Sequence, residues 1–235
     1  MVDAGVMHST DTTTRRPLRW AAAATGALLV LIAAVAVLGG PLRNDRLVTR
    51  FVAGHRTDWL IDTAKAISTM LSPVTTVVFA VTISVVFMYR DRSVRRAAAL
   101  LTGVCGAAGV AELLKLLVDR RRPPFAVQVE THEAAQSFPS GHVTGATALV
   151  VGLAVLAAPA ASANLRATML SMAAVVAVAS AVSRVYLGMH WTSDVVAGLL
   201  LGAATSLTAP AIVNRLDRVI DPIDARLFRR GTASA

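Results

Sequence analysis

The sequence is poor in charged residues. Of its 235 residues, 16% are charged and 55% are hydrophobic, whereas a soluble globular domain carries roughly 25% charged residues. The charges that do occur cluster between long apolar runs, and this pattern is typical of an integral membrane protein. The composition therefore argues against a soluble domain.

Aromatic residues and cysteine are scarce as well. Aromatics make up 5% of the chain, so packing must rely on small and aliphatic residues, which suit close helix–helix contact in lipid. The lone Cys105 excludes an intrachain disulfide. Lysine occurs only at Lys65 and Lys115, so arginine carries almost all of the net charge of +9. These basic residues flank apolar runs and form no soluble basic face, which excludes a nucleic-acid-binding protein.

Six apolar runs approach the length of about 20 residues that crosses a hydrocarbon core. They are residues 20–39, 73–89, 97–118, 143–158, 167–187 and 195–213. The first run is longer than the apolar part of a signal peptide and has no A-x-A site, so we expect a retained transmembrane helix. The second follows Ser72 and begins with Pro73, an N-cap and a proline at the first helical position. The sequence therefore predicts an all-α protein, an integral membrane bundle of six transmembrane helices.

The segments around these runs are polar. In the connection 42–71, apolar residues alternate with arginines and aspartates at partly helical spacing, which predicts an amphipathic helix on the bilayer surface. A solvated connecting helix is the alternative. Residues 1–19 and 214–235 are expected to be cytoplasmic tails on either side of the six-span domain 20–213.

Six spans place both termini on the same side of the membrane. With the N-terminus in the cytoplasm, the inner segments hold thirteen basic residues and the outer ones ten. The positive-inside rule favours this orientation, and we expect a multi-pass protein of the plasma membrane.

Three polar clusters fall on one membrane face in this topology, the extracytoplasmic one. They read K-L-L-V-D-R-R-R-P at 115–123, F-P-S-G-H at 138–142 and S-R-V-Y-L-G-M-H-W-T-S-D at 183–194. Three polar clusters that meet on one face predict a functional site.

The first cluster offers cations for an anionic ligand. Lys115 and Arg122 are seven residues apart, so they would project from one face if the helix persists to Arg122. Arg122 could bind a dianionic group through its fork and Lys115 as a point charge. For Arg120 and Arg121 we favour contact with lipid headgroups, as is common at helix ends.

The second cluster, Pro139-Ser140-Gly141-His142, precedes an apolar run. Free backbone N–H groups and a hydroxyl at the positive end of a helix dipole would form an anion site. Simple N-capping by Ser140 is the alternative. His142 adds a group suited to protonating a leaving oxygen.

The third cluster supplies a histidine and a carboxylate four residues apart. Asp194 can reach back to one imidazole nitrogen of His190 and leave the other nitrogen as a nucleophile or base. Arg184 would be a third cation, while Tyr186 and Trp191 are typical of an aromatic belt. The surplus of cations opposes a bound dication, so we expect no metal and no cofactor. It favours an anionic transition state such as that of phosphoryl transfer.

Together the clusters resemble the signature motifs of the type 2 phosphatidic acid phosphatase superfamily, K-x6-R-P, P-S-G-H and S-R-x5-H-x3-D. Every motif position matches between Lys115 and Asp194. The resemblance implies a metal-independent membrane phosphatase in which His190 attacks phosphorus, Asp194 orients His190, and His142 protonates the leaving oxygen. It also implies a set of residues that hold the phosphoryl oxygens: Lys115, Arg122, Ser140, Gly141 and Arg184.

The resemblance also narrows the substrate to membrane lipid phosphates. One class is a polyprenyl diphosphate of undecaprenyl or decaprenyl type, as in the recycling of cell-wall carriers. The other is a glycerolipid phosphate such as phosphatidic acid or phosphatidylglycerophosphate. A lipid phosphotransferase would share the phosphohistidine, and an anion or lipid transporter would use the cations without chemistry. The spacing of His190 and Asp194 favours an enzyme over a transporter.

Overall fold

The computed structural model describes residues 10–130 and 135–228, with side chains from residue 16 onward. Within these residues the chain folds into helices and turns and contains no β-strand. The long helices are α1 (Thr10–Leu38), α4 (Pro73–Asp91), α5 (Arg95–Val118), α6 (Gly141–Ala157), α7 (Ala163–Tyr186) and α8 (Thr192–Asn214). Shorter helices are α2 (Arg43–Gly54), α3 (Asp58–Met70) and α9 (Asp217–Phe228), with 3₁₀ turns at Phe125–Val127 and Ala158–Ala160.

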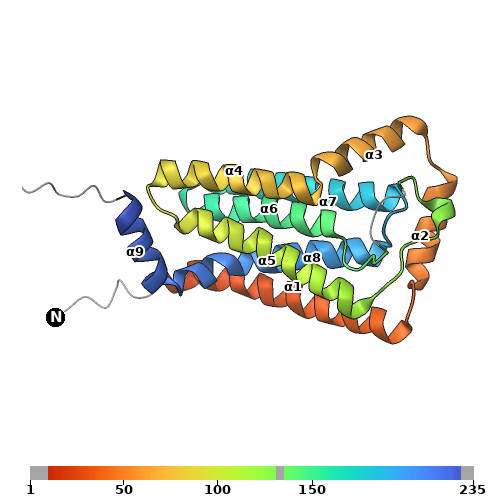
Figure 1. Ribbon diagram of the computed structural model, residues 1–235, viewed down its shortest axis with the longest axis horizontal. Helices are drawn as coiled ribbons and strands as arrows, with labels where there is room; N and C mark the ends of the chain where they lie inside the picture. Colours follow the sequence, from red (N-terminus) through yellow and green to blue (C-terminus); the bar gives the residue numbers. More distant parts are fainter. Residues whose placement is uncertain (1–9, 131–134, 229–235) are drawn as a thin grey trace, which may run out of the picture.

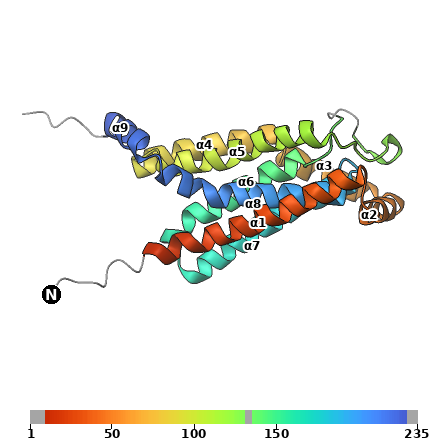
Figure 2. The same ribbon diagram turned by 90° about the horizontal axis from the view of Figure 1, so that it is seen from below.

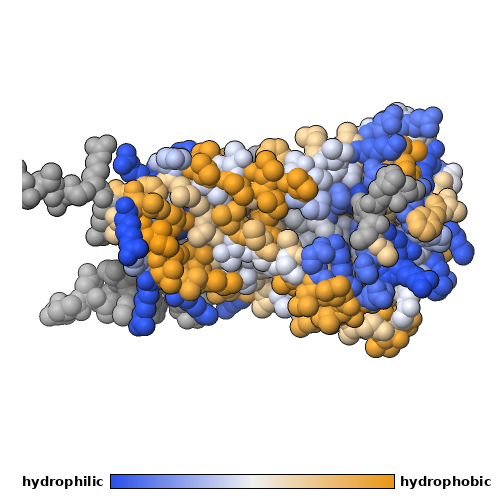
Figure 3. All heavy atoms as spheres, viewed as in Figure 1, coloured by the Kyte–Doolittle hydropathy of each residue, from blue (hydrophilic) through white to orange (hydrophobic). Residues whose placement is uncertain are grey.

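The six long helices run side by side along the long axis of the molecule (Figure 1). Each of them is long and apolar enough to cross a membrane, and this confirms the predicted six-span bundle. Large apolar side chains such as Val37, Val74 and Val175 point outward, as lipid contact requires. Figure 3 shows apolar side chains over much of the helical surface, and hydrophilic ones gathered at the end that carries α2 and α3.

Helices α6 and α8 form the centre of the bundle. Helix α8 packs against α1, α5 and α6, and α6 packs also against α4 and α7. Their backbones approach closely at Gly198 and Gly202, where a side chain would not fit. A Cβ on Gly202 would lie 2.5 Å from the carbonyl oxygen of Thr144. As a result the two helices begin side by side, and the Ser140 N–H donates to the carbonyl of Asp194 at 3.1 Å.

Local signals set two helix ends near the predicted clusters. Helix α4 begins as predicted, with the Ser72 hydroxyl accepting a hydrogen bond from the Thr75 N–H at 3.2 Å. Helix α5 ends at Val118, because Asp119 adopts a left-handed conformation with φ of 42°. This end agrees with the predicted apolar run 97–118, and the condition for Lys115 and Arg122 to share one helix face is not met, because Arg122 lies in the loop that follows.

The connection 42–71 forms two helices, α2 and α3, at one end of the bundle (Figure 2). Helix α2 buries Asp45 and Thr49 and exposes Leu47 and Phe51. Asp45 and Thr49 thus face the protein, while the large apolar residues face outward together with the exposed Arg43, Arg46 and Arg50. This arrangement suits a helix that lies on the bilayer surface and favours the predicted amphipathic helix over a solvated connection.

Both predicted tails contain helix. Helix α1 already begins at Thr10, and α9 lies within 214–235. Helix α9 is tied to α5 by Arg95, whose guanidinium contacts Asp217 at 2.8 Å and Asp221 at 2.5 Å. Helix α9 and the N-terminal end of α1 lie at the end of the bundle opposite to α2 and α3 (Figure 1). Residues 1–9 and 229–235 of the predicted tails lie outside the described residues.

Candidate active site

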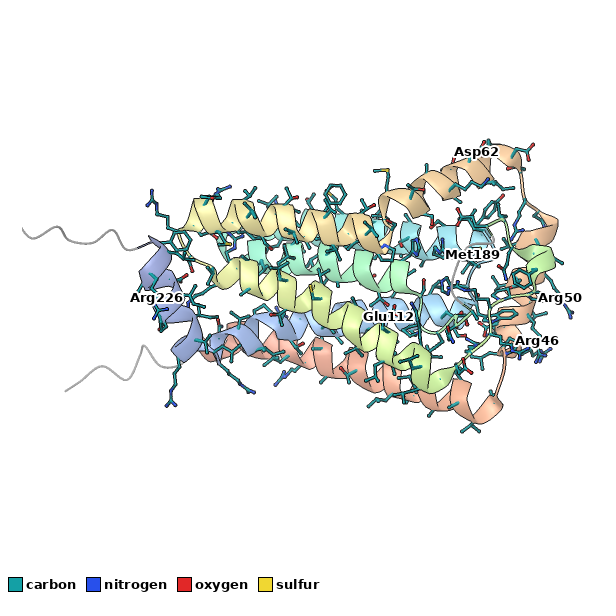
Figure 4. All side chains as sticks on the ribbon, in the orientation of Figure 1. Arg46, Arg50, Asp62, Glu112, Met189 and Arg226 are labelled. Atoms are coloured by element: carbon teal, nitrogen blue, oxygen red, sulfur yellow. The ribbon has the colours of Figure 1, made fainter. Side chains whose placement is uncertain are left out.

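The three polar clusters meet at the end of the bundle beneath α2 and α3. Arg122 of the first cluster donates to the carbonyl of Met189 in the third at 2.7 Å. Lys115 reaches the second cluster, since a Cβ placed on Gly141 would lie 3.5 Å from its Nζ atom. Figure 4 labels Glu112 on α5 and Met189 in the loop between α7 and α8, on two sides of this region. The convergence expected from topology is therefore present.

The hydrogen bonds of His190 define its tautomer. Its Nδ1 lies 2.8 Å from the carbonyl oxygen of Ser137, and its Nε2 lies 3.0 Å from Nη1 of Arg122. A carbonyl can only accept and a guanidinium can only donate. Nδ1 therefore carries the hydrogen, and Nε2 presents a lone pair. This is the form that a nucleophilic histidine needs.

Asp194 lies beside His190 without a direct hydrogen bond to it. Its Oδ2 is 3.6 Å from Nδ1 of His190 and accepts a hydrogen bond from the Trp191 N–H at 2.9 Å. The hydrogen-bond partner of Nδ1 is the carbonyl of Ser137, and Asp194 is a charged neighbour of the imidazole. Sequence reasoning missed Ser137, because a backbone carbonyl leaves no signature in the residue type.

Arg120 belongs to the interior. It is 5% exposed; its Nη1 donates to Oδ1 of Asp194 at 2.5 Å and its Nη2 to Oδ2 of Asp45 at 2.6 Å. The predicted headgroup contact is therefore wrong for Arg120, since the left-handed turn at Asp119 takes the chain off the helix and directs the next side chain inward. Arg121 is exposed, and for it headgroup contact stays a prediction.

The predicted phosphate-binding residues lie around the same centre. Lys115 donates to Oε1 of Glu112 at 2.6 Å. Arg184 is fully buried, and its Nη1 donates to the Ser68 hydroxyl at 2.6 Å and to Oε2 of Glu130 at 3.4 Å. Both cations therefore carry a carboxylate neighbour that an anionic ligand would have to compete with.

The start of α6 provides donors for an anion. Ser140 precedes α6, but its side chain makes no capping hydrogen bond. Its Oγ is buried and has no hydrogen-bond partner among the described residues, so the N-capping alternative is not realised. Gly141 and His142 are the first two residues of α6, and both are partly exposed. A hydroxyl and helix N–H groups are thus available to an anion.

The aromatic residues of the third cluster are tied to the protein. Trp191 is 6% exposed, and its Nε1 donates to the carbonyl of Arg121 at 2.8 Å. The predicted aromatic belt is therefore wrong for Trp191, whose indole holds the first and third clusters together. The Tyr186 hydroxyl accepts the Thr57 N–H at 3.0 Å and holds the start of α3.

A cavity of about 780 Å³ borders this centre between the C-terminal end of α1, α2 and the loop that follows α5. Arg120, Arg122 and Trp191 line its inner side, and Arg46, Arg50 and Arg121 bring further positive charge. Such a cavity suits a large anionic group.

Comparison with known proteins places this architecture in a family. A family model described as the PAP2 superfamily matches residues 96–218, just over half of the chain. This chain belongs to the PAP2 superfamily. The PAP2 match begins in α5 and extends through α8, so it contains all three polar clusters.

Two curated relatives of this chain carry phosphatase names. Decaprenylphosphoryl-5-phosphoribose phosphatase of Mycobacterium tuberculosis is 40% identical over 115 residues, which are 48% of this chain and 56% of that protein. Phosphatidylglycerophosphatase B of Bacillus subtilis is 39% identical over 94 residues, 39% of this chain and 45% of that protein. The chain thus spans about half the length of the curated relatives it matches.

A solved PAP2 structure shares this fold over most of the chain. The crystal structure of a transmembrane PAP2-type phosphatidylglycerolphosphate phosphatase from Bacillus subtilis aligns with a TM-score of 0.70. The alignment covers 85% of this chain and 96% of that one at 24% identity. The six-span arrangement described above is therefore a PAP2 fold.

Within the third PAP2 motif, Gly188 occupies one of the five unspecified positions. It has a φ of +71°, and a Cβ there would lie 2.0 Å from the carbonyl oxygen of Val127. The left-handed conformation costs an L-residue about 1–2 kcal/mol, and the clash adds to it. We expect Gly188→Ala to lower the free energy of unfolding by more than ~3 kcal/mol and to displace His190. Thermal unfolding of the purified protein in detergent measures the effect.

The control for this substitution is Gly54→Ala. Gly54 is the last residue of α2, and a Cβ there would meet nothing within 4 Å. The unfolding temperature of the Gly54→Ala variant should remain within about 2 °C of that of the unsubstituted protein. Equal unfolding temperatures for the two variants would show that the loop accommodates a side chain at Gly188.

Proposed function

We propose that this protein is a membrane phosphatase that hydrolyses a lipid phosphate through a phosphohistidine on His190. The observation that carries the proposal is the hydrogen bonding of the His190 ring. Nδ1–H is held by the Ser137 carbonyl, and the Nε2 lone pair lies against Arg122. A neutral imidazole with an oriented lone pair, surrounded by cations, is suited to attack on an anionic phosphoryl group.

In the first step the Nε2 lone pair forms a bond to phosphorus, and the bond from phosphorus to the leaving oxygen breaks. That oxygen takes a proton from His142. The Arg122 N–H that was hydrogen-bonded to Nε2 now donates to a phosphoryl oxygen, because the Nε2 lone pair is part of the new bond to phosphorus. The phosphorylated ring is cationic, and the Ser137 carbonyl and the Asp194 carboxylate at 3.6 Å stabilise it.

In the second step water attacks phosphorus, and the neutral His142 accepts its proton. The N–P bond breaks, its electron pair returns to Nε2, and inorganic phosphate leaves. Through both steps the phosphoryl oxygens are held by the predicted set, Lys115, Arg122, Ser140, Gly141 and Arg184. Positioning and charge stabilisation are the main contributions a protein makes to phosphoryl transfer.

For the substrate we propose a lipid whose head group ends in a phosphomonoester. The names of the two relatives describe decaprenylphosphoryl-5-phosphoribose and phosphatidylglycerophosphate. Both molecules carry a terminal phosphate on a polyol that is joined to the lipid through a second phosphate. The cavity lined by Arg46, Arg50 and Arg121 offers positive charge and space for such a head group. Either tail class of the sequence prediction, polyprenyl or glycerolipid, fits this description.

We also propose that the site faces outward from the plasma membrane. The excess of basic residues on the side of the termini supports this orientation. The polar clusters lie at the end of the bundle opposite to α9 and the start of α1 (Figure 1).

The test is phosphate release by purified protein from a panel of lipids. The panel contains decaprenylphosphoryl-5-phosphoribose, phosphatidylglycerophosphate, phosphatidic acid and undecaprenyl diphosphate. We expect release to be fastest, by about tenfold or more in kcat/KM, from one of the first two. We also expect vanadate to inhibit, since it mimics pentacoordinate phosphorus, and EDTA to have no effect.

Other outcomes of the panel decide between the alternatives. Transfer of phosphate to a lipid alcohol without free phosphate would identify a phosphotransferase. Binding of the lipids without any bond cleavage would identify a transporter. Loss of activity in EDTA would contradict the metal-independent mechanism.

A further inference from the structure

We propose that Asp45 and Arg120 are positioning residues of this reaction, which act on His190 through Asp194. Neither is a specified position of the three motifs, and Asp45 lies outside the motif region, in α2. The inference rests on the proposed function, since it concerns how the nucleophile of that reaction is controlled.

The two residues extend the charged network behind the nucleophile. Asp194 lies 3.6 Å from His190 and 2.5 Å from Arg120, and Arg120 lies 2.6 Å from Asp45. The chain of contacts therefore runs from imidazole to carboxylate, guanidinium and second carboxylate. Asp45, Arg120 and Asp194 are 1%, 5% and 0% exposed, so water screens these charges little.

Every hydrogen on the Nη atoms of Arg120 is used in this network. Nη1 donates to Asp194 and to the Ser193 hydroxyl, and Nη2 donates to Asp45 and to the Gly40 carbonyl at 3.2 Å. A guanidinium held at four points cannot rotate away from Asp194 without breaking several hydrogen bonds. Arg120 thus fixes the carboxylate that stabilises the cationic imidazole.

Asp45 holds the other side of Arg120 and also the start of α8. Its Oδ1 accepts the Ser193 N–H at 2.8 Å, and its Oδ2 accepts the Ser193 hydroxyl at 2.7 Å. Asp194 lies in the same first turn of α8, where the helix dipole favours negative charge. An aspartate from the α2 segment therefore sets the position of the turn that carries Asp194.

The network has a net charge that acts on His190. Two carboxylates and one guanidinium sum to one negative charge, which favours the cationic imidazole of the phosphohistidine. Removing the charge of Asp45 leaves a neutral pair of Arg120 and Asp194. The cationic ring then loses stabilisation, and the neutral form of His190 persists to lower pH.

Other charged groups surround His190 but stay unchanged in the test. Arg122 contacts Nε2 from the loop after α5. Further charged groups at this end are Lys115 and Glu112 of α5, His142 of α6, Arg184 of α7, Glu130 in the loop between α5 and α6, and the cavity residues Arg46, Arg50, Asp119 and Arg121. The ionisation of the substrate phosphate is likewise common to all variants. Their contributions cancel when variants are compared at the same salt concentration.

The first test is the pH profile of phosphate release by Asp45→Asn in the full-length protein. We expect the acid limb of kcat/KM to move to lower pH by roughly one unit, from the loss of one poorly screened charge. We expect kcat to fall about tenfold with KM within about twofold, because Asp45 does not touch the substrate. Asp62→Asn is the control, since Asp62 is an exposed carboxylate at the same end of the bundle (Figure 4).

The second test restores the net charge. The double variant Asp45→Asn with Arg120→Met again leaves one negative charge, that of Asp194. We expect its acid limb to return to within about 0.3 pH unit of the unsubstituted protein. Arg120→Lys keeps the charge without the fork, so its limb should stay in place while kcat falls about tenfold. If Asp45 and Arg120 had a purely structural role, their substitution would lower stability and activity. The acid limb would then neither shift in Asp45→Asn nor return in the double variant.

The outcomes separate this inference from the proposed function. No phosphate release by the unsubstituted protein contradicts the proposed function itself. Release with an unmoved acid limb in Asp45→Asn, or a limb that the second substitution fails to restore, overturns the inference alone. Unfolding temperatures of all variants in detergent identify any variant that does not fold. Asp45→Asn preserves side-chain size and Arg120→Lys preserves charge, so these two variants keep the test decisive.

Discussion

Substitution of His190 by glutamine is expected to abolish phosphate release. Glutamine is polar and of similar length, but its amide has no lone pair that can attack phosphorus. Removal of a nucleophile that forms a covalent intermediate costs about 10⁴-fold or more in kcat. Phosphate release by the purified variant in detergent measures the loss, and mass spectrometry at alkaline pH should show phosphate on His190 only in the unsubstituted protein.

His55→Gln provides the matched control for this substitution. His55 is exposed at the C-terminal end of α2, where its ring stacks on that of Phe51 with 4.3 Å between the ring centroids. It lies at the same end of the bundle, and its Nδ1 lies 2.8 Å from the carbonyl oxygen of Phe51 in α2. We expect its activity to remain within about twofold. Full activity of His190→Gln, or phosphate found on another residue, would contradict the phosphohistidine mechanism.

The second large effect is expected for Arg122→Lys. In the resting site Nη1 of Arg122 donates both to the Met189 carbonyl at 2.7 Å and to Nε2 of His190 at 3.0 Å. The guanidinium thus holds the loop that carries His190, and in the proposed mechanism it binds the phosphoryl oxygens of the substrate. Lysine keeps the charge but offers no planar fork. We expect kcat/KM to fall about 10²- to 10³-fold.

Arg43→Lys is the control. Arg43 is the exposed first residue of α2 and is not among the residues that line the cavity. Activity of this variant should stay within about twofold. If both lysine variants behaved alike, Arg122 would be one member of a diffuse positive surface, without a specific role at the reacting phosphate.

The fold was predictable because its signal is local. Runs of about 20 apolar residues can be counted along the chain, and the six that were found correspond to six helices of the structure. The same holds for the start of α4 at Ser72 and Pro73. The end of α5 at Val118 also agrees with the apolar run 97–118. The direction of the side chains after this helix was not predictable, because the left-handed Asp119 turns the chain so that Arg120 is buried while Arg121 is exposed.

The site was predictable only in part, for a related physical reason. Lys115, Arg122, His142, His190 and Asp194 could be named from residue type and spacing, since the chemistry needs cations, a nucleophile and a carboxylate. Their roles remain part of the proposal. Ser137 was not found, because it acts through a carbonyl that every residue possesses. Asp45 was not found either, because an aspartate between arginines in a polar connection reads as a solvated residue.

By itself, the sequence determined that this protein is a six-span helical bundle and which polar clusters reach one end of it. Hydrophobic length and alternation across the membrane suffice for those conclusions, since every backbone polar group in lipid must be satisfied within a helix. The tertiary structure alone decided which nitrogen of His190 carries the hydrogen. It also decided that Arg120 is buried between Asp45 and Asp194, 75 and 74 residues away along the chain. Pairing of buried charges depends on distances of a few ångströms between distant segments, and no local pattern records them.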